Sequence, residues 1–339
     1  MKIVYIVTTE NGFFAQGVMP WSSMNIQEIK KNLMKYNFEV RIVTFKFLED
    51  NINTLRNSII IYTSSQRNEH KNYISDLISF FDEDNILIPN LESLKAHDNK
   101  GYQVLFNYKY DLGLIESQYY CDVSEVNADS QVFPCVYKPA NGASSIGVEI
   151  VKNIEDIKKI VTSNWKIDKD FLKKNVKKYF LKSRYNHKWE EYISFAPSRF
   201  VLQKFLPGMD SDFKVLIFGD KYYLLKRYTQ KNDFRASGSG IHSRDICFDD
   251  AVKILDKAKE IKNKFKSHIY SLDLCIYNDQ VHVIEFQFTH VGPITLIDSE
   301  YHFSFSDNEW VKHYATANLE TEFSTSLIRY LNDSLTCSS

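Results

Sequence analysis

The sequence predicts a chain of mixed α/β and α+β class, with a parallel sheet in its N-terminal part and β-rich hairpins after it. Up to residue 90, short apolar runs alternate with segments of helical spacing. The expected strands are residues 3–7, 40–45, 59–62 and 86–88, and the expected helices are residues 26–33 and 73–81. Strands separated by helices imply right-handed crossovers and a parallel sheet. The length of 339 residues allows two or three domains.

Composition and charge exclude several classes of protein. The chain is 44% hydrophobic and 25% charged, with 42 basic and 43 acidic residues, so bulk charge gives no basis for binding nucleic acid or an anionic membrane. Its five cysteines (121, 135, 247, 275 and 337) are scattered and lack CxxC spacing, which argues against a zinc site or a disulfide framework. Residues 1–7 are too short for a signal peptide or a membrane span, so we expect a cytoplasmic protein.

A loop of small residues divides two apolar runs near the middle of the chain. Residues 132–137 read as a strand that ends at Lys138, and residues 148–151 read as the next strand. Gly142 and Gly147 permit positive φ, and residues 143–145 (Ala-Ser-Ser) leave backbone N–H groups open to a large anion. The glycine spacing is that of a Walker A loop, but Val148 stands where that motif has lysine. An ordinary hairpin turn is the alternative.

Two further hairpins carry charged residues. Residues 200–206 form an expected strand that ends at Pro207-Gly208, and residues 212–218 and 222–226 are expected to turn at Gly219-Asp220. Arg227 and Arg235 then flank a Gly/Ser segment, and two guanidinium groups suit a carboxylate or phosphate. A surface hairpin is the alternative for these residues taken singly.

The last hairpin, residues 271–287, contains two carboxylates, and its register decides where they point. A two-residue turn pairs Tyr277 with Gln280 and places Asp273 and Glu285 on opposite faces. A three-residue turn sets Asp273 across from Glu285, with Gln287 on the same face and residues 272, 274, 284 and 286 on the other. Two carboxylates in an otherwise apolar hairpin need a counter-charge, such as Mg²⁺ with nucleotide phosphates. Solvent-facing carboxylates near a strand end are the alternative.

The order of these motifs from about residue 94 to residue 287 resembles the ATP-grasp superfamily, and in particular its glutamate-ligase-like carboxylate–amine ligases. The resemblance implies a pre-ATP-grasp domain (residues 1–92), a central lobe with linker helices and a glycine flap (93–199), and a C-terminal ATP-grasp lobe (200–339). It also implies ATP and Mg²⁺ (or Mn²⁺) as cofactors, small-molecule carboxylate and amine substrates, and a homodimer as one oligomeric state. No nucleic-acid partner and no membrane span are expected.

The resemblance also assigns roles to particular residues. It implies that Arg235, supported by Arg227, steadies an acyl phosphate. The implied metal ligands are Asp273, Glu285 and Gln287, although the family ends this motif in Glu-x-Asn, and the longer glutamine puts ligation of a second metal in doubt. The implied nucleotide-binding residues are Lys100, Lys138, Gly142, Ser144, Ser145, Gly147, Gln203, Lys204, Phe205, Leu206 and, for the ribose, Asp212.

The expected activity is therefore ATP-dependent amide formation from a carboxylate and an amine, with release of ADP and phosphate. An ATP-grasp protein with impaired ligation and an ATP-grasp kinase remain as alternatives. Three other features are open. The eleven lysines of residues 152–188 are either a solvated helix face or a binding patch. The loop around Asn11 and Gly12 is either part of a substrate pocket or a solvent loop. His290 is either a base or a structural residue. Residues 319–331 read as a final helix.

Overall fold

The computed structural model describes residues 3–19, 22–65, 67–142, 146–163, 173, 176–186, 198–231, 233–265, 267–297 and 299–336. The chain divides into two compact units. The large unit comprises Met1–Ile115 and Gly208–Ser339, and the small unit comprises Glu116–Pro207. None of the helices in the described ranges is long and apolar enough to cross a membrane.

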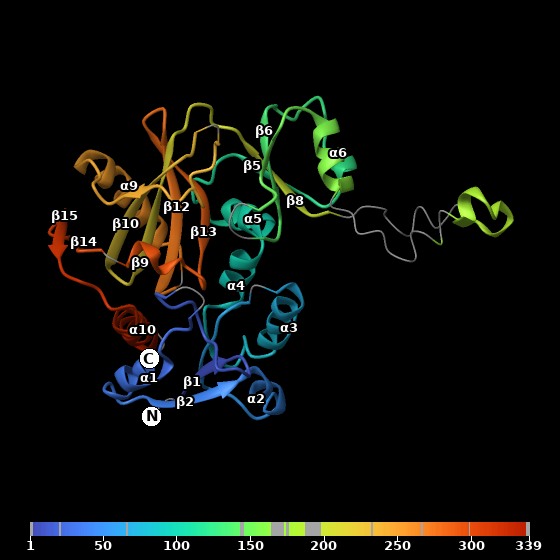
Figure 1. The fold of residues 1–339 in the computed structure, drawn as a ribbon. Coiled ribbons are helices and arrows are strands. Elements are labelled where there is room, and N and C mark those ends of the chain that lie inside the picture. Colours follow the sequence, from blue (N-terminus) through green and yellow to red (C-terminus); the bar gives the residue numbers. More distant parts are fainter. Residues whose placement is uncertain are drawn as a thin grey trace. The chain divides into compact units, whose positions relative to one another are not determined.

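The N-terminal sheet of the large unit is parallel, as the sequence predicts (Figure 1). Its strands are β1 (Ile3–Thr8), β2 (Glu39–Thr44), β3 (Ile59–Ile61) and β4 (Ile86–Ile88), in the order β2-β1-β3-β4. Because side chains alternate along a strand, Val4 and Ile6 of β1 enter one core, and Tyr5 and Val7 enter another. The crossovers carry α1 (Ile26–Met34), α2 (Phe45–Asp50) and α3 (Asn68–Ser79).

A larger antiparallel sheet forms the rest of the large unit. Its order is β13-β12-β9-β10-β14-β15, and β11 (His242–Ser243) pairs with β10. The strands are β9 (Ser211–Phe218), β10 (Lys221–Tyr228), β12 (Ile269–Tyr277), β13 (Gln280–Gln287), β14 (Tyr301–Ser306) and β15 (Glu309–Tyr314). The β9–β10 hairpin turns where predicted, since Phe218 pairs with Lys221. The aromatic segment after residue 300 forms the hairpin β14–β15.

The two faces of this sheet differ in polarity. On one face, Val215, Ile217 and Leu272 pack against the buried side of α9 (Phe248–Lys262). On the other face, β9 presents Leu216 and Phe218 at one end to a core that includes α10 (Leu319–Thr336). The remaining end of that face carries polar and charged residues. We call it the polar face; its members are Asp212, Lys214, Arg227, Ser271, Asp273, Glu285 and Gln287.

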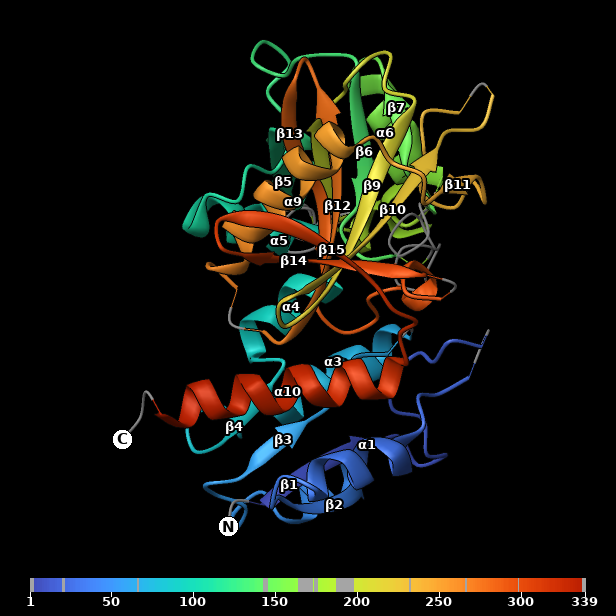
Figure 2. The same cartoon turned by 90° about the vertical axis from the view of Figure 1, so that its left-hand side faces the viewer.

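The final helix binds the N-terminal sheet as well as the C-terminal sheet. Phe323 and Leu327 of α10 share one core with Leu33 of α1, Ile6 of β1 and Phe218 of β9. Figure 2 shows α10 alongside α1. The predicted helix over residues 319–331 is confirmed, and its apolar face connects the two sheets of the large unit.

The β12–β13 hairpin combines features of the two registers that the sequence left open. Its turn has two residues, because Tyr277 pairs with Gln280, and Asn278 and Asp279 have φ of 50° and 61°. Yet Asp273 lies across from Glu285, because the register shifts between Asp273 and Leu274. Ile284 is the extra residue of this β-bulge. Val283, rather than Ile284, therefore enters the core beside Leu274.

Two helices before the small unit brace β13. They are α4 (Leu91–Asp98) and α5 (Lys100–Tyr110), as the sequence predicts for this region. The buried Gln103 amide donates to the carbonyl oxygens of Ala96 (3.0 Å) and Phe286 (2.8 Å), and the Phe106 ring packs on that of Phe286. These contacts fix the first turn of α5 next to β13, the strand that carries the implied metal ligands Glu285 and Gln287.

In its described residues, the small unit is an antiparallel sheet with one helix packed on its core. The strands are β5 (Ser117–Tyr120), β6 (Cys135–Pro139), β7 (Glu149–Val151) and β8 (Phe200–Lys204), in the order β5-β8-β6-β7. Ile157 and Val161 of α6 (Ile154–Ser163) cover Cys135 and Leu202. The predicted strand–loop–strand is present, but its first strand begins at Cys135 instead of residue 132. Val132 is 70% exposed, and Pro134 has no N–H for a ladder.

Candidate functional site

Four adjacent strands assemble the polar face. The ladder pairs place Asp212 across from Arg227, Lys214 across from Asp273, and Asp273 across from Glu285. Ser271 and Gln287 form the next pair on the same face. Because residues of one face recur every second position, Asp212 and Lys214 on β9 and Asp273 and Ser271 on β12 all point the same way.

Arg227 holds two buried carboxylates at once. Its Nε and Nη2 donate to Asp212 Oδ1 and Oδ2 at 2.6 and 2.8 Å, and Nη2 also lies 3.0 Å from Asp273 Oδ2. Burial raises the pKa of Asp212 to about 6, although Arg227 acts in the opposite direction. Burial also opposes ionisation of Asp273, but Arg227 and Lys214 together bring its pKa down to about 2. The planar guanidinium suits this role because it donates two parallel bonds to one carboxylate.

Lys214 lies inside the polar face and was not singled out from the sequence. Its Nζ is 3.2 Å from Ser271 Oγ, 3.3 Å from Asp273 Oδ1 and 3.5 Å from Gln287 Oε1. A Cβ added at Gly292, whose φ is 73°, would stand 3.0 Å from Lys214 Cε, so that glycine leaves room for the lysine. The alternation that puts Lys214 on the same face as Asp212 was the available sequence signal.

Lys100 lies beside one of the predicted metal ligands. It is the first residue of α5, where the Asn99 side chain accepts from Gly101 N and Tyr102 N. Its Nζ is 3.6 Å from Glu285 Oε1. The large unit therefore brings together six residues that the sequence singled out: Lys100, Asp212, Arg227, Asp273, Glu285 and Gln287.

The donor set fits one divalent cation better than two. Asp273 and Glu285 are cross-strand neighbours, and Mg²⁺ is often held by one or two carboxylates together with phosphate oxygens and water. In the described part of the chain, however, no group of three or more His, Cys, Asp or Glu side chains could hold a metal ion. Lys214 already bonds both Asp273 and Gln287, so these two residues do not present an open second site.

A smaller polar cluster follows the polar face along β13. His290 Nε2 is 3.1 Å from the carbonyl oxygen of Ser64, and its ring centroid is 5.6 Å from that of His97. Asp98 accepts from Ser64 Oγ at 2.5 Å and lies 3.5 Å from Lys71 Nζ. Burial lowers the pKa of both histidines. His290 thus makes a structural contact to the loop after β3.

The small unit carries the remaining nucleotide-binding predictions. Lys138 is buried on β6 and pairs with Val201 of β8 in the ladder. Gly142 and Gly147 have φ of 132° and 72°, so both adopt the left-handed backbone that the sequence predicts for the loop. A Cβ at Gly147 would also approach Pro139 Cγ to 3.0 Å. Ser144 and Ser145 lie outside the described residues.

Strand β8, which carries the predicted nucleotide-binding residues Gln203 and Lys204, is a central strand of its sheet. It pairs with β5 on one side and with β6 on the other. The Lys204 N–H donates to Glu116 O at 2.8 Å, on the side of β5. The Gln203 amide is buried and donates to Ser117 Oγ at 3.1 Å. The ladder thus uses the backbone of Gln203 and Lys204, and Phe205 and Leu206 follow beyond the strand end.

Arg235 lies in the segment after β10. Its Nε and Nη2 donate to the Asp233 carboxylate at 2.9 and 2.8 Å, and the Asp233 pKa is lowered by these bonds. The Arg235 side chain is 38% exposed, so solvent reaches part of it.

Two pockets lie at the carboxyl ends of the N-terminal strands. The chain passes from β1 to β2 on one side and from β3 to β4 on the other, so the switch point of this sheet is between β1 and β3. Ligands of open α/β sheets commonly bind there. An open pocket of about 800 Å³ includes Asn11, Lys46, Ser65 and Arg67 in its lining. Asn11 is one of the residues for which the sequence left a substrate pocket open.

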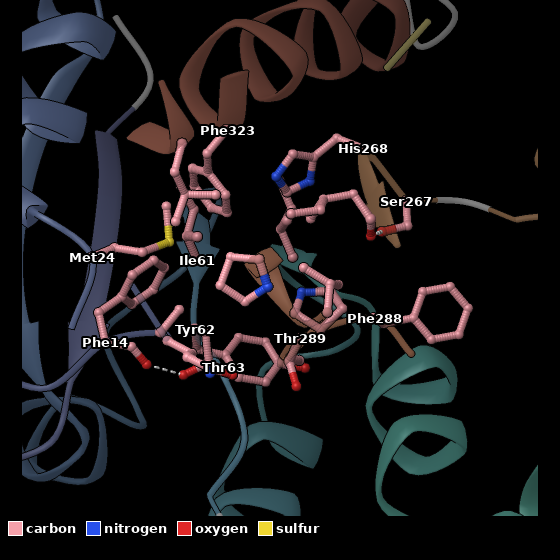
Figure 3. A pocket seen from close by; sticks show the side chains of 18 residues that line it. Phe14, Met24, Ile61, Tyr62, Thr63, Ser267, His268, Phe288, Thr289 and Phe323 are labelled. Carbon is pink, nitrogen blue, oxygen red and sulfur yellow. Dashed lines mark hydrogen bonds between the residues drawn. The ribbon is translucent and has the colours of Figure 1, made fainter. Parts of the chain in front are cut away.

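The second pocket is small and largely apolar (Figure 3). Side chains from the loop after β1, from β3, from the start of β12, from the segment after β13 and from α10 line it. Its interior of about 20 Å³ suffices for a water molecule. Tyr62 Oη, Thr289 Oγ1 and both ring nitrogens of His268 are buried and have no partner among the described residues. Such groups are the usual partners of a buried water.

The comparisons with known proteins agree on the fold. The chain has the ATP-grasp fold, and three solved structures with that arrangement match it along nearly its whole length. D-cycloserine synthetase DcsG matches with 11% identity, 97% of this chain and 99% of that chain covered, and a TM-score of 0.56. D-alanine–D-alanine ligase from Bacillus anthracis matches with 16% identity, 99% and 98% coverage, and a TM-score of 0.51.

A third solved structure and one family model also match the chain. D-alanyl-alanine synthetase A from Vibrio cholerae O1 biovar eltor has 13% identity, 99% and 98% coverage, and a TM-score of 0.53. Residues 115–178 match the family model described as D-ala D-ala ligase C-terminus, a segment that contains Lys138, Gly142 and Gly147. A search of curated protein sequences found no match.

Proposed function

We propose that this protein is an ATP- and Mg²⁺-dependent carboxylate–amine ligase. The observation that carries the proposal is the polar face, where Asp273 and Glu285 lie side by side with Arg227 and Lys100 in contact with them. It occurs on the fold that solved D-alanine–D-alanine ligases share with this chain. At 13–16% sequence identity, the likeness to these ligases supports the fold. The charged groups of the polar face support the proposed ATP-dependent reaction.

Nucleotide binding is assigned to the residues that the resemblance singles out. Lys100 and Lys138 hold the α- and β-phosphates, and the loop of residues 142–147 covers the β- and γ-phosphates through its backbone N–H groups. The purine lies along residues 203–206. The Asp212 carboxylate accepts ribose hydroxyl groups with lone pairs that its bonds to Arg227 leave available, since each carboxylate oxygen can accept twice.

The proposed metal ligands are Asp273 and Glu285. When bound, Mg²⁺ neutralises negative charge on the phosphates, so that an anionic carboxylate can approach them. Arg227 would keep Asp273 ionised and oriented, and Lys100, 3.6 Å from Glu285, would place a positive charge beside the phosphates. Catalysis of this kind consists mainly of positioning and electrostatics, so a nucleophilic Ser or Cys is not required.

The reaction has two steps. An oxygen of the substrate carboxylate forms a bond to the γ-phosphorus as the bond from that phosphorus to the β,γ-bridging oxygen breaks, giving ADP and an acyl phosphate. The amine nitrogen then attacks the acyl carbon, the carbon–oxygen bond to phosphate breaks, and the amine loses a proton to solvent or a nearby base. Arg235 stabilises the negative oxygen that develops on the acyl carbon.

The substrates are assigned to the switch point of the N-terminal sheet. The open pocket there has Lys46 and Arg67 as cationic lining residues and Glu10 as an anionic one, which suits molecules that carry a carboxylate and an amine. Amino acids, peptides and sugar acids all meet that description.

A nucleotide-binding protein with impaired ligation is the second candidate. Two observations favour it. Lys214 and Arg227 bond the two oxygens of Asp273, and Gln287 stands where the family has asparagine. The two candidates differ in turnover and share nucleotide binding.

The test is an ADP-release screen of amino acids and sugar acids against a panel of amines. We expect ADP release that requires both substrates, and mass spectrometry should find the amide product. Lys138→Ala should abolish the signal. Nucleotide binding without turnover across the panel would favour the second candidate, and a stable phosphorylated product would indicate a kinase.

A further inference from the structure

Lys214 occupies the middle of the polar face. This buried lysine projects from the middle of β9 into the space bounded by Ser271, Asp273 and Gln287. Its three contacts are to oxygen atoms at 3.2–3.5 Å. A divalent ion bound at the same place would also take oxygen atoms as its ligands.

The surroundings of Lys214 leave room for its side chain and provide oxygen atoms around its ammonium group. A Cβ at Gly292 would stand 3.0 Å from Lys214 Cε and 3.5 Å from Nζ, so the glycine leaves room for the end of the lysine. Its positive φ of 73° also favours glycine there. The Ser271 hydroxyl is buried, and its Oγ lies 3.4 Å from Gln287 Oε1 in addition to accepting from Lys214. The ammonium group is thus surrounded by oxygen atoms and by backbone that leaves it room.

Gln287 is consistent with a lysine partner. Glutamine carries its amide oxygen one methylene further from the backbone than asparagine does. In this structure that oxygen reaches the lysine ammonium at 3.5 Å and the serine hydroxyl at 3.4 Å.

We propose that Lys214 supplies a fixed positive charge between Asp273 and Gln287, and that the nucleotide complex consequently takes one divalent cation instead of two. The inference rests on the proposed function, since it concerns the ATP complex. The single cation is then held at Glu285 and the remaining lone pairs of Asp273.

The experiment counts bound Mn²⁺ by electron paramagnetic resonance in the presence of saturating AMP-PNP, a non-hydrolysable ATP analogue. The native chain should bind one Mn²⁺ per chain. Lys214→Met keeps the length of the side chain and removes its charge, and it should bind two. Lys221→Met is the matched control, because Lys221 lies on the same sheet and pairs with Glu322 at 2.7 Å, and it should bind one.

A second variant protects the test against misfolding of Lys214→Met. Gln287→Asn restores the shorter amide while Lys214 remains, and it should still bind one Mn²⁺. Two Mn²⁺ ions on the native chain, or a count of one on a folded Lys214→Met chain, would overturn the inference and leave the proposed function intact. Failure of the native chain to bind AMP-PNP would instead overturn the proposed function, and this inference with it.

Discussion

Arg227 is the residue on which the polar face depends most, because it is bonded to two buried carboxylates. The variant Arg227→Ala leaves Asp212 and Asp273 without this partner. Removing one partner of a buried ion pair commonly lowers the free energy of unfolding by about 3–5 kcal/mol. We expect a loss in that range, measured by denaturant unfolding monitored by circular dichroism.

The matched control is Arg41→Ala. Arg41 makes an ion pair with Glu39 at 2.6 Å, but its side chain is 51% exposed. Water screens an exposed ion pair, so this variant should unfold at nearly the same denaturant concentration as the native chain. A loss below about 1 kcal/mol for Arg227→Ala would mean that the buried carboxylates take up protons or find other partners.

His268 gives the folded chain a specific dependence on pH. It is buried, neither ring nitrogen has a partner in the described residues, and burial lowers its pKa to about 3. The unfolded chain, with an ordinary histidine pKa near 6.5, binds the proton more tightly. The free energy of unfolding should therefore fall as pH drops below about 6.5, by up to about 1.4 kcal/mol per pH unit, until pH approaches 3.

The measurement is a set of denaturant-unfolding curves between pH 7 and pH 4 for the native chain and for His268→Phe. Phenylalanine suits the site because His268 packs on the rings of Phe323 and Tyr330. Subtracting the two curves isolates the His268 contribution, and the native chain should lose more stability than the variant. The exposed His242→Gln serves as control and should parallel the native chain. Parallel curves for the native chain and His268→Phe would show that the protonated ring is stabilised in the folded chain, because a buried water or another group accepts a hydrogen bond from it.

At the scale of elements, the β12–β13 hairpin shows what sequence patterns can and cannot predict. Turn residues and alternation predicted the hairpin and both candidate registers. A β-bulge inserts one residue without a composition signal of its own, and Ile284 resembles its apolar neighbours. The bulge reconciles a two-residue turn with facing carboxylates, so each register was correct for a different part of the hairpin.

The turn itself is testable through Asn278. With φ of 50° and 61° at Asn278 and Asp279, the turn needs left-handed backbone at both positions. Asparagine and glycine adopt it readily, but a β-branched residue is strained there by about 1–2 kcal/mol. Asn278→Val should lower the free energy of unfolding by about that amount, while Asn278→Gly should stay within about 1 kcal/mol of the native chain. Equal effects of the two substitutions in thermal unfolding would argue against this turn.

For the whole molecule, the motifs predicted the fold and most of the polar face, because they lie on strand ends whose order is visible in the sequence. Lys214 was missed, since a lysine in an apolar strand reads as solvent-facing until the strands on both sides are known. The packing of α10 could not be predicted from the sequence either. Its periodicity predicted a helix, but only the fold shows that it contacts both sheets of the large unit.

Nucleotide binding should stabilise the chain as a whole, because a ligand that binds only the folded state raises its unfolding temperature. At a concentration of about 100 times the dissociation constant, the gain is about 2.7 kcal/mol. With an unfolding entropy of about 2.1 cal/mol/K per residue, a chain of 339 residues should gain about 4 °C with Mg²⁺ and AMP-PNP in differential scanning fluorimetry. Lys138→Ala should reduce this ligand-induced shift to near zero whatever its own unfolding temperature. Lys152→Ala, an exposed lysine of the same unit, should keep the full shift. Equal shifts in native chain and Lys138→Ala would remove Lys138 from the phosphate-binding residues, because a charge that contributes to binding cannot be lost without weakening it.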